Sequence, residues 1–253
     1  MSALTDRFRF LHQQGCFVMP NPWDPGSARL LVQLGFPALA TTSSGFAWSL
    51  GRRDMTRAVD VPINADFEGG FAVEPHAVAA NVTAAVATGI AGISIEDSSG
   101  EASKPLFDFE FSVERVKLAR AAIDKSGTGV LLTARSEGFL VGLPDLGETI
   151  RRLAAYAAAG AECLYAPGLR TIGDIKAVVE AVAPKPVNVL AGSDFTTVAE
   201  LSAAGVRRIS VGGALARTAW TGFLAAAKEV AEKGTFSALG RAIPFADINA
   251  RFD

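Results

Sequence analysis

The chain has 253 residues, a length that favours one large α/β domain over two small ones. Hydrophobic residues make up 49% of it and charged residues 20%, which excludes a disordered chain and a long exposed coiled coil. The net charge is −2, so no basic surface is expected for nucleic-acid binding. No apolar run approaches the ~20 residues that span a bilayer, and we expect a cytoplasmic protein without membrane contact.

Eight short apolar runs recur along the chain, and each ends in small, polar or charged residues. Four or five apolar residues without polar alternation are typical of strands buried on both faces of a parallel sheet. The predicted strands are residues 16–19, 38–42, 61–65, 91–95, 130–134, 163–166, 187–190 and 208–211.

Helical segments follow most of these strands. Asp24 and Pro25 mark a helix start, with Asp as N-cap and Pro at the first helical position. Several helices are expected to end at a glycine, because a C-cap often needs a left-handed residue. The predicted helices are residues 24–35, 75–89, 112–124, 146–160, 171–183, 196–205 and 213–233. Eight such units predict a (β/α)8 TIM-type barrel forming a single domain over residues 1–253, with a doubly wound sheet as the alternative.

The crossover between the second and third strands is short. Residues 45–60 show no amphipathic helix of normal length, although a parallel crossover usually needs a dozen or more residues, mostly helical. Two interpretations stay open: the second barrel helix is truncated, or residues are missing from the chain.

Acidic residues gather at the ends of the third, fourth and fifth predicted strands, where a barrel places its active site. Carboxylates this crowded repel one another unless a cation lies among them, and Mg²⁺ prefers oxygen ligands. Arg135 follows the fifth strand and is suited to hold a substrate carboxylate with two N–H groups. We therefore expect a metal-centred site for an anion; alternatively, each acid has a structural partner, as Glu137 would if it only held Arg135. The acids are Asp66, Glu68, Glu96, Asp97 and Glu137.

The histidines and cysteines give no catalytic signal. His12 precedes the first strand and His76 lies in the first turn of a helix, so both are expected to be surface or packing residues. Cys16 and Cys163 are too few for a disulfide framework or a four-thiolate zinc site.

Five motifs in order resemble those of the isocitrate lyase/phosphoenolpyruvate mutase superfamily, over about residues 8–230. Members of that superfamily act on 2-oxo or 2-hydroxy carboxylates and make or break C–C or P–C bonds through a Mg²⁺-stabilised enolate. The resemblance implies such an enzyme, with Mg²⁺ as cofactor or Mn²⁺ in its place. The motifs are Asn21-x-Trp23-Asp24-x-Gly26-Ser27-Ala28, Thr41-Thr42-Ser43-Ser44-Gly45, Asn64-Ala65-Asp66-x-Glu68-x-Gly70-Phe71, Gly92-Ile93-Ser94-Ile95-Glu96-Asp97 and Ala134-Arg135-Ser136-Glu137.

The resemblance also implies roles for single residues. Asp66 would be the principal metal-site residue, and Glu68 and Glu96 would hold metal-bound waters. Arg135 would clamp the substrate. Asp54 would be an active-site acid. The full set of catalytic candidates is Arg135, Asp54, Glu96 and Lys104.

Substrate binding would involve the loop after the second strand, whose backbone N–H groups would contact the substrate carboxylate and the enolate oxygen. Two residues at the ends of the first and seventh strands are further candidates. The full set is Ser44, Gly45, Phe46, Trp23 and Asn188.

The loop at residues 98–106 differs from its counterparts in the superfamily. Isocitrate and methylisocitrate lyases carry Lys-Lys-Cys-Gly-His there, but this loop has neither Cys nor His. Phosphonate-active mutases carry a Lys and an Asn there and a His after the sixth strand; this chain has Lys104 but no loop Asn, and Tyr165-Ala166-Pro167 replaces the His. We expect a Mg²⁺-dependent C–C lyase or decarboxylase for a small, oxaloacetate-like 2-oxo or 2-hydroxy carboxylate. The alternatives are a phosphonomutase or phosphonopyruvate hydrolase, and a non-catalytic binder of 2-oxo acids.

Two further expectations concern a lid and the assembly. Loop 98–106 is placed to close over bound substrate and bring Lys104 to the anion, or Lys104 is a solvated surface residue. The segment at about 235–253 carries Ile243, Phe245 and Ile248, which are costly to leave in water. Superfamily members are usually tetramers that exchange C-terminal helices, so we expect a homotetramer in which this segment contacts a neighbouring subunit.

Overall fold

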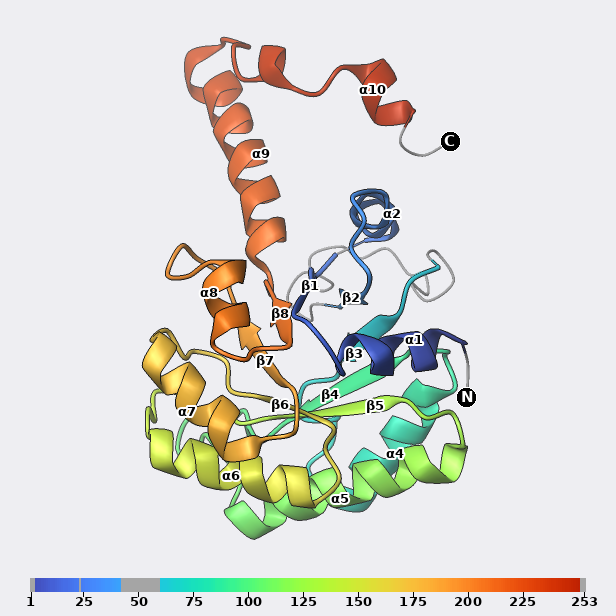
Figure 1. The fold of residues 1–253 in the computed structure, drawn as a ribbon. Helices are drawn as coiled ribbons and strands as arrows, with labels where there is room; N and C mark the ends of the chain where they lie inside the picture. The colour runs from blue at the N-terminus through green and yellow to red at the C-terminus, as the bar shows by residue number, and fades with distance from the viewer. Residues whose placement is uncertain (1–2, 23, 42–59, 251–253) are drawn as a thin grey trace.

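The computed structural model describes residues 3–22, 24–41 and 60–250 (Figure 1). Within them, eight parallel strands form one sheet in the order β1-β8-β7-β6-β5-β4-β3-β2, with helices packed around it. The sheet curls into a nearly closed barrel, which confirms the predicted TIM-type fold and excludes the doubly wound alternative. No described helix is long and apolar enough to cross a membrane.

All eight predicted strands are present, and their ends lie within two residues of the predicted ones. Strands β3, β4 and β5 extend one residue beyond the predicted ends, to Asp66, Glu96 and Arg135. Their bounds are β1 (Phe17–Met19), β2 (Leu39–Ala40), β3 (Ile63–Asp66), β4 (Gly92–Glu96), β5 (Leu131–Arg135), β6 (Cys163–Tyr165), β7 (Val187–Leu190) and β8 (Arg208–Ser210).

The seven predicted helices are also present. Asp24 caps α2 as expected: its side chain accepts the Ser27 N–H at 2.6 Å, and the Ser27 hydroxyl accepts the Asp24 N–H at 3.1 Å. The crossover at 45–60 falls almost wholly within residues 42–59, outside the described residues. The helix bounds are α1 (Ala3–Leu11), α2 (Pro25–Gln33), α4 (Pro75–Val86), α5 (Phe109–Ser126), α6 (Leu146–Ala158), α7 (Ile172–Val182), α8 (Val198–Ala203), α9 (Ala214–Lys233), the 3₁₀ helix η2 (Leu239–Arg241) and α10 (Phe245–Asn249).

Helix α1 was not predicted from the sequence. It buries Phe8 completely in an apolar cluster with Phe17, Met19 and Leu131. His12, just beyond the helix, packs edge-on against Phe8 and Phe17, with ring centroids 4.7 and 5.1 Å apart. The helix thereby covers apolar side chains at the N-terminal end of the barrel, and His12 is a packing residue, as expected.

Asn21 joins the two ends of the sheet. Its side-chain N–H donates to the Thr41 carbonyl at 2.8 Å, beyond β2. Its side-chain oxygen accepts the N–H groups of Val211 and Gly212, beyond β8, at 3.1 and 2.9 Å. A backbone hydrogen bond from Ala40 to the Pro20 carbonyl, 3.0 Å, links β2 to the chain after β1. These contacts hold the C-terminal mouth of the barrel together.

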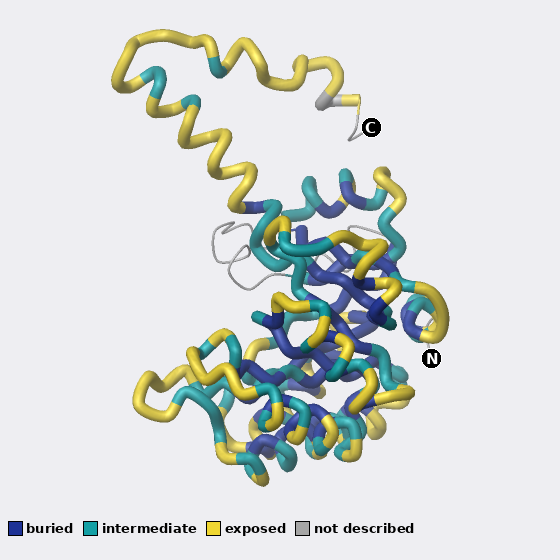
Figure 2. The backbone as a smooth tube through the Cα atoms, turned by 60° about the vertical axis from the view of Figure 1, so that its left-hand side comes forward, coloured by how far each residue is buried: buried dark blue, intermediate teal, exposed yellow. Residues whose placement is uncertain are grey.

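The last part of the chain leaves the barrel. Helix α9 projects from the end of β8, and η2 and α10 turn back from its far end (Figure 1). Figure 2 shows this arm as almost continuously exposed, in contrast to the buried barrel strands. Its large apolar side chains include Trp220, Phe223 and Phe236, and Phe245 is 80% exposed.

Candidate active site

A cavity of about 200 Å³ lies inside the C-terminal mouth of the barrel. Most of its polar lining comes from strand residues, so it is built on the rigid part of the fold. The side chains that carry charge or hydrogen-bonding groups into it include Asp66, Ser94, Arg135, Tyr165, Asn188 and Arg208.

Arg135 is the centre of the charged cluster. Its Nη1 lies 2.8 Å from Asp66 Oδ1, its Nη2 3.3 Å from Glu96 Oε2 and its Nε 2.9 Å from Glu137 Oε1. The guanidinium carbon also lies 5.0 Å from the centroid of the Tyr165 ring. Burial lowers the pKa of Arg135, but the charge of Glu137 leads the opposing effects that raise it above its usual value. Arg135 therefore remains a cation.

The carboxylates carry more charge than Arg135 neutralises. Burial, with the charges of Glu137 and Asp66, raises the pKa of Glu96 to about 7, although Arg135 opposes the rise. Burial likewise raises the pKa of Glu137. An additional cation here would therefore be favoured electrostatically.

The prediction that a metal organises five acids is only partly reflected in the geometry. Among residues 3–22, 24–41 and 60–250, no three Asp, Glu, His or Cys side chains are grouped as a metal site. Asp66 and Glu96 converge on Arg135, and Glu137 holds Arg135, as in the structural alternative. Asp97 points away and pairs with Arg152. Two converging carboxylates still fit Mg²⁺, which often uses one or two carboxylates plus waters.

Asp66 is oriented by neighbouring strands. Its backbone N–H donates to Thr41 Oγ1 at 2.7 Å, and its Oδ1 accepts a hydrogen bond from the Ser94 hydroxyl at 3.4 Å. Glu68 is exposed in the loop that follows, and its carbonyl accepts the Glu96 N–H at 3.0 Å. Its φ of 46° lies in the left-handed region, which is uncommon for residues with a Cβ. The main chain of Glu68 is thus fixed beside Glu96.

Arg115, from α5, holds the same loop from behind. This buried guanidinium donates to the carbonyl oxygen of Ala72 at 2.8 Å and to those of Gly69 and Val73. Its carbon lies 4.3 Å from the centroid of the Phe107 ring. Sequence reasoning missed Arg115, because nothing in its helical neighbours distinguishes it from a surface arginine.

Asn188 and Arg208 form a second polar group inside the barrel. Asn188 Oδ1 accepts from Arg208 Nε at 2.8 Å, and Asn188 Nδ2 donates to Ser210 Oγ at 3.0 Å. Arg208 Nη1 donates to Thr133 Oγ1 at 3.1 Å. Asn188 does line the cavity, as its candidate role requires. Arg208 was missed, although a charged residue opening an apolar strand was a usable signal.

Lys104 lies away from this cluster. It is exposed, and its Nζ is 2.6 Å from Asp108 Oδ2. An isolated antiparallel β-bridge joins Ser98 and Leu106, and the Ser99 N–H donates to the Pro105 carbonyl at 3.0 Å. These contacts close the base of the loop that carries Lys104. The other candidates, namely Trp23, Ser44, Gly45, Phe46 and Asp54, lie outside the described residues.

A comparison with known families matches residues 8–231 to the family described as phosphoenolpyruvate phosphomutase. The chain belongs to this family. The predicted superfamily, one of lyases and mutases, is thereby confirmed, and with it the assignment as an enzyme.

Individual relatives are similar over most of the chain. An uncharacterized protein of Mycobacterium tuberculosis (strain CDC 1551 / Oshkosh) is 34% identical, covering 96% of this chain and 95% of that protein. An oxaloacetate decarboxylase of Paraburkholderia xenovorans is 30% identical, covering 69% of this chain and 64% of that enzyme. A crystal structure from Burkholderia cenocepacia J2315, described in provisional terms as a lyase/mutase, has a TM-score of 0.94 at 43% identity and covers 98% of this chain and 95% of its own.

Proposed function

We propose that the chain is a Mg²⁺-dependent lyase that decarboxylates a small 2-oxo dicarboxylate with the shape of oxaloacetate. The observation that carries the proposal is Arg135, a partly buried cation in a small cavity, oriented by Asp66, Glu96 and Glu137. The similarity of the chain to an oxaloacetate decarboxylase supports the same substrate class.

Arg135 would bind a carboxylate of the substrate and fix its orientation. A guanidinium presents N–H groups in a planar fork that matches a carboxylate. Glu137 keeps the Nε side of the fork occupied, so the Nη atoms, now near Asp66 and Glu96, would turn to the substrate. Asp66 and Glu96 would then be available to a cation, with Glu68 close by.

Mg²⁺ held by these carboxylates would stabilise the negative charge that develops on the 2-oxo oxygen as CO₂ leaves. The chain itself supplies the remaining conditions. The cavity of about 200 Å³ limits the size of the substrate. The Tyr165 ring beside Arg135 and the buried strand ends restrict access of water, which strengthens the contact between guanidinium and carboxylate.

The test is pyruvate release from oxaloacetate, measured with Mg²⁺ and after treatment with EDTA. We expect catalysis above the rate of Mg²⁺ alone, loss of it with EDTA, and recovery when Mg²⁺ or Mn²⁺ is restored. Arg135→Gln, which removes the charge, should abolish the enzymatic part of the rate. Equal rates for wild type and Arg135→Gln would contradict the proposal.

A phosphonate-directed reaction is the second candidate. A crystal structure from Burkholderia cenocepacia J2315, described in provisional terms as a phosphonomutase, is 34% identical and has a TM-score of 0.81, covering 89% of this chain and 99% of its own. Turnover of phosphonopyruvate but not of oxaloacetate would favour this candidate. Oxalate binding without turnover of either compound would instead favour a non-catalytic binder of 2-oxo acids.

The exposed C-terminal arm supports the homotetramer as a further part of the proposal. Phe223, Phe236 and Phe245 are large apolar side chains that are exposed on this arm. Such a series of exposed apolar side chains on an extended arm would be covered by neighbouring subunits.

A further inference from the structure

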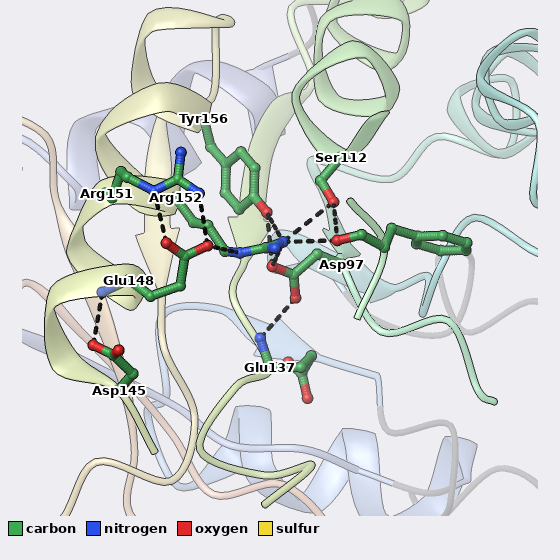
Figure 3. Close-up of polar contacts among 9 residues, drawn as sticks. Asp97, Ser112, Glu137, Asp145, Glu148, Arg151, Arg152 and Tyr156 are labelled. Carbon is green, nitrogen blue, oxygen red and sulfur yellow. Dashed lines mark hydrogen bonds and ion pairs between the residues drawn. The ribbon is translucent and has the colours of Figure 1, made fainter. Parts of the chain in front are cut away.

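Asp97, at the end of β4, lies in a buried polar network behind the cavity (Figure 3). Its Oδ1 accepts the backbone N–H of Glu137 at 2.8 Å. Its Oδ2 accepts the Tyr156 hydroxyl at 2.7 Å and Arg152 Nη1 at 3.1 Å. Both carboxylate oxygens are therefore engaged, and the side chain does not line the cavity.

The network continues in two directions. Towards the cavity, the main chain that Asp97 holds belongs to Glu137, whose own carboxylate accepts Arg135 Nε at 2.9 Å. Away from it, Arg152 on α6 donates from Nε to Glu148 Oε1 at 2.8 Å and from Nη1 to the Phe107 carbonyl at 3.1 Å. Arg152 thus ties helix α6 to the end of loop 98–106 and to Asp97.

We propose that Asp97 is a positioning residue, which fixes the backbone of Glu137 and thereby the orientation of the Arg135 guanidinium. The inference rests on the proposed function of Arg135 as the group that binds the substrate carboxylate. Arg135 has a long side chain, and its orientation depends on where Glu137 stands. Glu137 follows the end of β5, so its position depends on contacts from outside the sheet. The side chain of Asp97, which follows the end of β4, supplies such a contact.

Arg152 and Tyr156 in turn hold Asp97. A buried carboxylate is costly unless its lone pairs are used by donors, and these two side chains supply donors to the same oxygen. If either donor is lost, Asp97 is held by the other alone, and the N–H of Glu137 has a less firmly fixed acceptor. Supporting residues of this kind typically change activity by roughly 10–100-fold without touching the ligand.

Helix α6 offers a matched pair of variants. Arg151 and Arg152 both contact Glu148, but Arg152 also reaches Asp97, whereas Arg151 is exposed (Figure 3). Arg152→Met removes the contact to Asp97, and Arg151→Met is the control. Asp97→Asn and Tyr156→Phe are second variants of nearly unchanged size. The Asp97→Asn change leaves one acceptor oxygen in place of two, and the Tyr156→Phe change removes one donor.

The first measurement is backbone amide hydrogen exchange of the peptide containing Glu137, followed by mass spectrometry. It needs no substrate and so judges the anchoring even if oxaloacetate is the wrong substrate. We expect exchange at Glu137 to accelerate about tenfold or more in Asp97→Asn and Arg152→Met, less in Tyr156→Phe, and not in Arg151→Met. Peptides from α4 and α7 should exchange as in the wild type.

The second measurement is kcat/KM for oxaloacetate at a temperature where circular dichroism shows each variant folded. We expect a loss of about 10–100-fold in Arg152→Met and Asp97→Asn and none in Arg151→Met. Unchanged exchange at Glu137 in both Asp97→Asn and Tyr156→Phe would overturn the proposal. Faster exchange with kcat/KM equal to that of Arg151→Met would also overturn it. Absence of turnover in the wild type would instead refute the proposed function, while the exchange data still decide the anchoring.

Discussion

Asp66 and Glu96, at the ends of two adjacent strands, contact the same guanidinium: Arg135 lies 2.8 Å from Asp66 Oδ1 and 3.3 Å from Glu96 Oε2. The Arg135 guanidinium therefore lies between the two carboxylates, where a metal ion bound by both would also lie. A metal ion that binds these carboxylates must compete with Arg135, and its binding would release the Nη atoms for the substrate. Metal binding and substrate binding are thereby expected to be coupled.

Removing the Asp66 carboxylate should weaken both metal binding and turnover. We expect Asp66→Ala to reduce Mg²⁺ affinity and turnover at least about tenfold, because one of two converging carboxylates is lost. Mg²⁺ titrations of turnover and calorimetry of Mg²⁺ binding measure the effect. Glu114→Ala, on the exposed side of α5, is the control. Wild-type activity of Asp66→Ala under limiting Mg²⁺ would show that the metal site lies elsewhere.

Lys104 tests whether loop 98–106 acts as a lid. If the loop closes, Lys104 would leave Asp108 and contact the substrate anion. Lys104→Ala should then lower kcat/KM by a factor equivalent to roughly 2–4 kcal/mol of activation free energy. Mg²⁺ affinity should change little, because the metal candidates lie on the barrel.

Lys117, in an exposed pair with Glu114, provides the matched control for Lys104. Proteolysis of loop 98–106 should slow when oxalate and Mg²⁺ are present together. Unchanged kinetics of Lys104→Ala, with proteolysis indifferent to ligand, would make Lys104 an ordinary surface lysine.

Arg115 should control the order of the loop after β3. Replacing it with Met leaves the carbonyl groups of Gly69, Ala72 and Val73 without this donor, and we expect faster amide exchange in residues 69–73 and weaker Mg²⁺ binding. Lys at this position keeps the charge but lacks the fork, so Arg115→Lys should restore only part of the order. Wild-type exchange in Arg115→Met would show that the loop is held by other contacts.

His12 should make the protein sensitive to acid. Burial, with a smaller effect of the Arg208 charge, lowers the pKa of His12 to about 3. In the unfolded chain its pKa is about 6.5, so the unfolded state binds a proton that the folded state excludes, and stability falls as the pH drops below about 6.5. The loss attributable to His12 is about 2 kcal/mol at pH 5.

Urea unfolding of wild type and His12→Phe at pH 7 and pH 5 measures this loss. The wild type should lose about 2 kcal/mol more than the variant between the two pH values. His76→Gln, at an exposed position, is the control. An identical pH dependence of wild type and His12→Phe would refute the assignment.

The C-terminal arm should hold the subunits together. We expect light scattering to give the mass of a tetramer, and Phe223→Asp combined with Phe245→Asp to give smaller species, because both positions are exposed in the isolated subunit. Far-ultraviolet circular dichroism should show that the barrel remains folded. A monomeric wild type would contradict the predicted assembly.

The barrel was predictable because its strands are buried on both faces and stand out as apolar runs. The meeting of Asp66, Glu96 and Arg135 was predictable for a related reason. Residues that follow parallel strands lie at the same edge of the sheet, so sequence position fixes their neighbourhood.

The supporting contacts could not be predicted in this way. Arg115 and Arg152 lie on helices where charged residues are common, and their partners are loop carbonyls and the Asp97 carboxylate far away in sequence. Asp97 comes directly after Glu96, the last residue of β4, but successive side chains of a strand point to opposite faces. Asp97 therefore faces α6 rather than the cavity. Helix α1 was missed because its burial rests mainly on Phe8, which gives no periodic apolar pattern.

Glu68 is held in a backbone conformation that suits glycine better. Its φ of 46° costs a residue with a Cβ about 1 kcal/mol, and its side chain is exposed, so no packing is lost when it is shortened. A screen for heat resistance should therefore recover Glu68→Gly, whereas a screen for turnover should reject it. Selection for thermal stability and selection for activity would therefore favour different residues at position 68. In a thermostabilised form of the enzyme, the residue at position 68 should be examined first.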